Sequence, residues 1–218
     1  MSPESVLVEA CVTTVDEAVA SFDAGAERVE LCRALHVGGL TPDADTVEAT
    51  LAAVPGPVNV LVRSNADTFR LTPTEVDALI GEVASLVDLG VDGVVVGALD
   101  RNGRVDRAAL DALVDAARGR PVTFHRAFDE VEAPLDAIEP LARAGVRRVL
   151  TSGGAPTAWE GRETLRALVE ACGDELTVLG GGRVRGDHVR RLVEATGLTE
   201  VHARASAIPG VVAGLQDS

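Results

Sequence analysis

Short apolar runs alternate along the chain with longer stretches in which apolar residues recur every three or four positions. The short runs are rich in β-branched residues and predict strands. They lie at Leu7–Cys11, Arg28–Cys32, Val58–Arg63, Val94–Leu99, Val122–Arg126, Val149–Ser152, Leu176–Leu179 and Glu200–Ser206. The longer stretches predict helices, as in "DRAALDALVDAARG", where Leu110, Leu113 and Val114 share one helix face. This alternation predicts a parallel sheet covered by helices.

A weak internal repeat indicates how the sheet closes. A glycine precedes a strand valine by four residues at the even-numbered strands, in the pairs Gly25/Val29, Gly90/Val94, Gly145/Val149 and Gly197/Val201. A repeat that contains two βα units and occurs four times along the chain gives eight strands, and this predicts a TIM (β/α)8-type barrel. The rival is an open doubly wound sheet, which often has a Gly-rich turn after its first strand, but "CVTTVDE" follows here.

The domain prediction is one barrel domain over residues 1–218, because no linker or low-complexity tract interrupts the alternation. The chain ends soon after the last predicted strand, in "AIPGVVAGLQDS". We therefore expect the last helix to be short or missing, with the exposed barrel flank a candidate contact for a partner subunit.

The period-two pattern of the strands places polar side chains inside the predicted barrel. Glu9 with Cys11, and Glu30 with Cys32, fall on the faces opposite the apolar residues of their strands. The same parity directs inward the residues Asn59, Leu61, Arg63, Thr123, His125, Glu200, His202, Arg204 and Ser206.

These inward charges have two interpretations. They form a buried salt-bridge network that fills the barrel, or they form a site at the strand C-termini, where barrel enzymes keep theirs. We favour a site, with catalytic candidates Glu9, Glu30, Arg63, His125 and His202, and Arg126 at the rim. For each residue a structural role stays open: carboxylates paired with arginines, or a hydrogen-bonded core histidine. Asp129 as a helix cap and Phe69 as loop packing are the simpler interpretations of those residues.

Two glycine-rich turns are candidates for anion binding, since glycine lets backbone N–H groups approach a phosphate. Ser152 and Gly153 lie at the end of the sixth predicted strand, and Gly181, Gly182 and Arg183 follow the seventh. Steric requirements of the turns explain such glycines equally well.

Composition narrows the function classes. A formal net charge of -14 argues against nucleic acid or an anionic membrane surface as partner. The start of the chain lacks signal-peptide character and no run is long enough to span a bilayer, so we expect a cytoplasmic protein.

The residue types that the chain lacks limit its chemistry. All 20 cationic side chains are arginine, which excludes lysine Schiff-base chemistry. Three cysteines do not make a disulfide framework.

The tripeptide pattern E-x-C occurs at the ends of the first two predicted strands, as Glu9-Ala10-Cys11 and Glu30-Leu31-Cys32. Two inward thiols on neighbouring strands suit a soft ion such as Cu(I). Two small buried hydrophobic residues are the alternative.

Four segments resemble the CutC family, which has been called the copper homeostasis protein family: "RVELCRALHVGGLTP", "PVTFHRAFDEV", "RVLTSGGAPTA" and "EVHARAS". The resemblance spans nearly the whole chain. It implies a cytoplasmic TIM-type barrel, dimeric or higher, that binds Cu(I), with Cys11 and Cys32 matching the family's strand-end cysteines. The resemblance implies no enzyme activity, because none is accepted for the family. The segment "VRSNADTFRLTP" departs from the family's Arg-Pro-Arg-x-Gly-Asp-Phe-like pattern but keeps Arg63, Asp67 and Phe69.

Two hypotheses for function follow. The first is a Cu(I)-binding homeostasis protein that uses Cys11 and Cys32. The alternative is an enzyme of unnamed reaction acting on a small phosphorylated or carboxylated molecule at the barrel mouth, and the sequence leaves open whether there is turnover.

Overall fold

Eight parallel strands close into a barrel in the computed structural model, which describes residues 6–216. The strands are β1 Leu7–Val12, β2 Arg28–Leu31, β3 Val58–Leu61, β4 Gly93–Val96, β5 Val122–Phe124, β6 Arg148–Thr151, β7 Thr177–Gly180 and β8 Glu200–Arg204. Consecutive strands pair in parallel and β1 pairs with β8, so the barrel has no open sheet edge. The predicted TIM-type barrel is confirmed.

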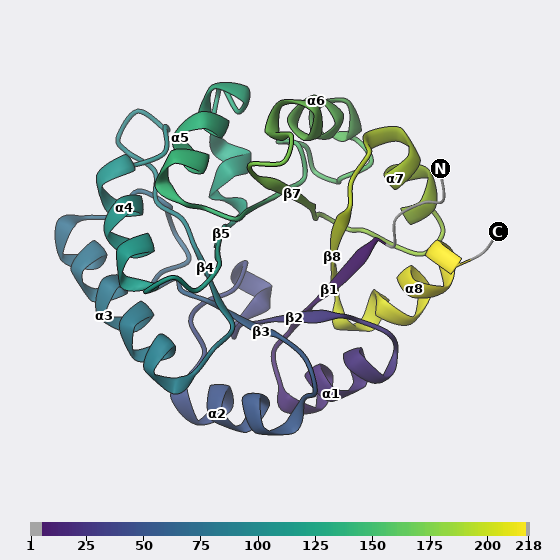
Figure 1. Cartoon of the computed structure of the whole chain (residues 1–218), viewed down its shortest axis with the longest axis horizontal. Helices are drawn as coiled ribbons and strands as arrows, with labels where there is room; N and C mark the ends of the chain where they lie inside the picture. Colours follow the sequence, from purple (N-terminus) through teal and green to yellow (C-terminus); the bar gives the residue numbers. More distant parts are fainter. Residues whose placement is uncertain (1–5, 217–218) are drawn as a thin grey trace.

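Helices surround this barrel in a ring (Figure 1). They are α1 Val15–Asp23, α2 Ala44–Ala53, α3 Pro73–Leu89, α4 Arg107–Ala116, α5 Ile138–Ala144, α6 Arg162–Cys172, α7 Val189–Thr196 and α8 Ile208–Gln216. The last helix is therefore present, and its nine residues match the length of α1 and exceed the lengths of α5 and α7. Short 3-10 helices, including η1 Leu35–Val37 and η2 Arg126–Glu130, lie in the loops that follow β2 and β5.

Local sequence accounts for the helix boundaries. The side chain of Asp106 caps α4 by accepting the N–H of Ala109 at 3.1 Å, and Leu110 and Leu113 are then fully buried. The repeated glycines of the sequence pattern all have positive φ, and those before β4, β6 and β8 cap the ends of α3, α5 and α7. A left-handed residue at this position stops the helix, and glycine adopts it without strain.

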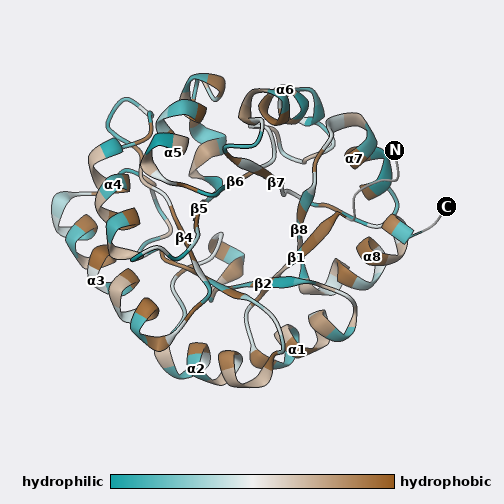
Figure 2. Ribbon diagram, viewed as in Figure 1, coloured by the Kyte–Doolittle hydropathy of each residue, from teal (hydrophilic) through white to brown (hydrophobic). Residues whose placement is uncertain are grey.

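The main hydrophobic core lies between the barrel and the helices. It contains outward-facing strand residues such as Val29, Val94 and Phe124, none of which is exposed. Inside the barrel the only described apolar cluster is small: Cys11, Cys32, Leu61 and Val95. Figure 2 shows hydrophilic colouring on β2 within the ring of helices. The interior is therefore mainly polar, and this positions the candidate site.

No helix within residues 6–216 combines the length and apolarity needed to cross a membrane.

Candidate functional site

A group of charges, here called the floor cluster, lies across the interior near the start of the strands. It consists of Glu9, Arg28, Asn59, Arg148 and Glu200. Arg28 donates to Glu9 and to Glu200, each at 2.5 Å, and Arg148 donates to Glu200 at 2.8 Å. The amide of Asn59 donates to Glu9 at 3.2 Å. Every charge of this cluster has an opposite charge as its partner.

Glu9 connects the floor cluster to the next layer of the interior. Its Oε1 atom lies 2.8 Å from Nδ1 of His202. Burial alone would raise the pKa of Glu9, but Arg28 and His202 outweigh it and lower the pKa to about 2. Burial would lower the pKa of His202, whereas the bond to Glu9 and the nearby Glu30 raise it. Since Glu9 accepts the Nδ1 proton, Nε2 is the nitrogen of His202 that is left for a ligand.

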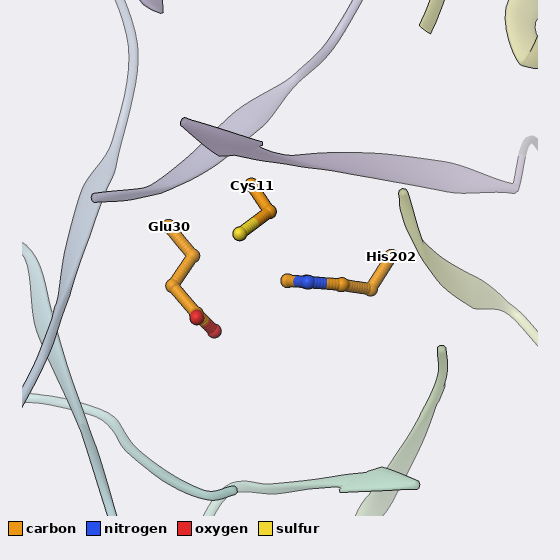
Figure 3. Close-up of side chains that lie close together, drawn as sticks. All are labelled: Cys11, Glu30 and His202. Atoms are coloured by element: carbon orange, nitrogen blue, oxygen red, sulfur yellow. The ribbon is translucent and has the colours of Figure 1, made fainter. Parts of the chain in front are cut away.

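Above this layer, Cys11, Glu30 and His202 bring potential ligand atoms to within 4.8 Å of one another. Their side chains converge from β1, β2 and β8, as Figure 3 shows. Cys32, the other predicted thiol, has its sulfur 3.8 Å from that of Cys11. The hydrogen bond to Cys32, burial and the charge of Glu30 together raise the pKa of the Cys11 thiol. In the described residues this is the one group of three or more such side chains that suits a metal ion.

Glu30 differs from Glu9 in having no close partner. Its Oε2 atom is buried and has no hydrogen bond to any described residue. Burial raises the pKa of Glu30 to about 7, with His202 opposing the shift and Glu9 adding to it. A carboxylate with this pKa exchanges a proton near neutral pH, as a general base requires.

His125 follows β5 and is held as a neutral imidazole. Its Nδ1 accepts the N–H of Ala127 at 3.1 Å, so Nε2 carries the proton. Burial and then the charge of Arg63 lower the pKa of His125 to about 3. The ring lies 5.0 Å from the ring of Phe69, centroid to centroid. Gly97 makes this placement feasible, because a Cβ there would lie 2.4 Å from the imidazole.

Asp129 fills the first of the two predicted anion sites. Its Oδ1 accepts the N–H groups of Ser152 and Gly154, each at 3.0 Å, and the hydroxyl of Thr151 at 2.6 Å. Its Oδ2 pairs with Arg126 at 2.7 Å. The turn after β6 thus binds a carboxylate of the chain itself, and Gly153 donates to Thr151 at 2.9 Å. Asp129 does not cap the following helix.

The mouth of the barrel is a cavity of about 770 Å³ at the C-terminal ends of the strands. Glu30, His125, Phe69 and Cys11 line its interior. Five arginines line it as well, here called the mouth arginines: Arg63, Arg126, Arg183, Arg185 and Arg204. Its size is within the range of pockets that hold small molecules.

Comparison with known proteins agrees with this architecture. A model of the CutC family matches residues 6–207. The chain belongs to the CutC family. It is 42% identical over 199 residues to family protein CutC of Mesorhizobium japonicum, covering 91% of this chain and 77% of that protein. Identity to the CutC protein of Xanthomonas campestris strain B100 is 41% over 198 residues, covering 91% and 82% of the two chains.

The CutC crystal structure from Streptococcus agalactiae has a TM-score of 0.86 to this fold. It is 27% identical, and the match covers 90% of this chain and 97% of that one. The resemblance inferred from the four sequence segments is therefore confirmed, together with the barrel that it implied.

The structure brings most of the site residues predicted from strand parity and the glycine-rich turns to one place. Glu30, Arg63, His125, Arg126 and His202 line the same cavity, as do Gly182 and Arg183. Glu9 lies below them, paired in the floor cluster, and the N–H of Gly181 donates to the carbonyl of Thr151 at 2.9 Å.

Sequence reasoning missed three features of this interior. Arg28 has the parity of Glu30 and Arg148 has that of Ser152, so period two could have identified both. Phe69 lines the cavity, with the guanidinium of Arg63 4.5 Å from its ring centre, although loop packing was predicted. No pattern in the sequence indicates this placement, because it depends on the fold of the loop after β3.

Proposed function

We propose that the protein binds Cu(I) through Cys11 and Cys32. The observation that carries this proposal is the contact between their sulfur atoms, 3.8 Å apart inside the barrel. Thiolates are soft ligands and select Cu(I) over hard divalent cations. The CutC structure from S. agalactiae carries a provisional assignment to copper homeostasis, which supports the same role in this relative.

The surroundings of the thiols suit a bound ion. Both cysteines are at least 95% buried, so an ion between them would be shielded from water. Glu30 and His202 offer an unpaired carboxylate oxygen and the Nε2 nitrogen next to Cys11. Because the pKa of Cys11 is raised, binding must release a proton from that thiol.

Competition for Cu(I) against a chromogenic chelator, under reducing and oxygen-free conditions, tests this proposal. We expect one equivalent of Cu(I) per chain, with binding at least about a hundredfold weaker after C11S together with C32S. C172S is the matched control, because Cys172 is also buried but belongs to α6 in the outer core. Unchanged affinity in the double variant, or equal loss in the control, would contradict the proposal.

A second candidate function is proton transfer on a small anionic substrate, and the unpaired oxygen of Glu30 favours it. Glu30 would accept a proton from a hydroxyl-bearing carbon next to a carbonyl and return it to the carbonyl carbon, while the hydroxyl proton moves to the carbonyl oxygen. The Nε2–H of His125 would donate to the carbonyl oxygen, and Arg63 with Arg126 would hold the anionic group. Glu9 would orient His202.

This enzyme hypothesis is tested by solvent exchange. The protein is incubated in D₂O with a panel of phosphorylated and carboxylated sugars, and deuterium incorporation is followed by mass spectrometry. Incorporation that E30Q abolishes and C32S retains is the expected result. No incorporation into any member of the panel counts against it.

We further propose a single-domain cytoplasmic protein that forms a homodimer or higher homo-oligomer, as the resemblance implied. Light scattering coupled to size-exclusion chromatography measures the assembly, and a monomeric mass would refute it.

A further inference from the structure

Several arginines at the mouth of the barrel lack a carboxylate partner, whereas every charged side chain of the floor cluster has an oppositely charged one. Arg183, Arg185 and Arg204 have no carboxylate within ion-pair distance in residues 6–216, whereas Arg126 pairs with Asp129. The Nε atom of Arg63 is buried and has no hydrogen-bond partner among the described residues. On a chain with a formal charge of -14, this is a local excess of positive charge around a cavity. Uncompensated cations of this kind focus anions into a cleft.

The turn after β7 adds backbone donors to these arginines. Gly182 and Arg183 both have positive φ, 103° and 57°, and both line the cavity. Their N–H groups donate to no acceptor within the described part of the chain. The equivalent groups after β6 already bind the carboxylate of Asp129. The β7 turn is therefore the one of these two turns that is free to bind an external anion.

We propose that the mouth binds the phosphate group of a small phosphorylated metabolite. The phosphate lies at the N–H groups of Gly182 and Arg183, between the side chains of Arg183 and Arg204. A phosphate monoester has three acceptor oxygens and about two negative charges, and it uses several guanidinium and N–H donors at once. The rest of the molecule extends toward Glu30 and His125, which line the interior of the same cavity.

This inference is independent of copper binding, because it uses neither thiol. It names the substrate class for the proton-transfer hypothesis but does not require turnover. Binding of a phosphate monoester without deuterium exchange supports this inference and counts against the enzyme hypothesis.

Isothermal titration calorimetry in a low-salt, phosphate-free buffer tests the proposal. The probes are glycerol 3-phosphate and ribose 5-phosphate, with glycerol, ribose and inorganic phosphate as comparisons. At least one phosphate monoester binds, the uncharged compounds do not, and R183Q and R204Q each weaken binding at least about tenfold. R147Q is the matched control, because Arg147 is exposed just before β6 begins, at the opposite end of the barrel.

Four outcomes would overturn the proposal. They are no binding of either monoester, unchanged affinity in both mouth variants, an equal loss in R147Q, and inorganic phosphate binding as tightly as the monoesters. The third would show an effect of overall charge, and the fourth would identify free phosphate as the ligand. Circular dichroism checks that R183Q and R204Q fold like wild type.

Discussion

The floor cluster and the mouth differ in how their charges are paired, although both are polar regions inside one barrel. In the floor cluster, Arg28 bridges Glu9 and Glu200 at 2.5 Å to each. At the mouth, Glu30 has an unpaired buried oxygen, and Arg183 and Arg204 have no carboxylate partner in the described chain. Both sequence interpretations of the inward charges thus apply, each to a different layer of the interior.

This difference separates residues that hold the barrel together from residues available to a ligand. A buried ion is tolerated when its partners compensate the lost hydration, as for Glu9. A buried carboxylate without such partners weakens the fold, and proteins keep such groups mainly where function requires them. Two glutamates on adjacent strands, Glu9 and Glu30, illustrate the two cases.

The largest effect is expected for E9Q, which removes the charge that faces Arg28 and His202. We expect the free energy of unfolding to fall by about 3–5 kcal/mol, because Arg28 loses one of its two buried counter-charges. Urea unfolding followed by circular dichroism measures this change. A fall in the free energy of unfolding of less than about 1 kcal/mol would show that ion pairing in the floor cluster does not stabilise the fold.

The next effect concerns the pH dependence that His125 imposes. Its folded pKa of about 3 lies below the ordinary value of 6.5, so between these values only the unfolded chain binds the proton. Stability contributed by neutral His125 is therefore present above pH 6.5 and is lost as the pH falls. Between pH 6.5 and pH 5 wild type loses about 2 kcal/mol through this group. In urea unfolding at the two pH values, H125Q should lose correspondingly less free energy of unfolding than wild type. Equal losses in the two proteins would show that His125 is not the source of this pH dependence.

E30Q is the mouth counterpart of E9Q and is expected to have the opposite sign. The folded pKa of Glu30, about 7, lies above its ordinary value of 4.5, so wild type loses stability as the pH rises from about 4.5 to 7 and keeps the full loss above pH 7. At about pH 8 we expect E30Q to be more stable than wild type by about 1 kcal/mol. Destabilisation by E30Q as large as that by E9Q would remove the distinction between the two layers.

The smallest effect is expected for R204Q, since Arg204 is exposed and has no ion-pair partner among the described residues. Its free energy of unfolding should stay within about 0.5 kcal/mol of wild type. A larger loss in urea unfolding would assign Arg204 a structural role.

The sequence predicted the barrel and most of its inward residues, because strand parity and the glycine repeat are local signals. Cys11, Glu30 and His125 are buried on the interior face as predicted. The height of each residue along the barrel axis is not a local signal. It depends on the stagger of the strands, which sets Glu9 beside Arg28 and His202 but sets Cys11 beside Glu30 and Arg204.

Loop geometry was equally inaccessible from the sequence. The two glycine-rich turns look alike in the sequence, and only the tertiary structure shows that Asp129 occupies the turn after β6. Phe69 reaches His125 from a loop whose path no periodic pattern specifies. Pairing between distant segments therefore decided which of the predicted site residues remain available to a ligand.

A crystal structure of the protein with Cu(I) and a phosphate monoester bound would test the division between floor and mouth most directly. The structure predicts an anomalous copper peak between Cys11 and Cys32 and phosphate density at Gly182 and Arg183, with the floor cluster unchanged. Copper at Cys172 or at surface histidines, or phosphate bound within the floor cluster, would contradict it.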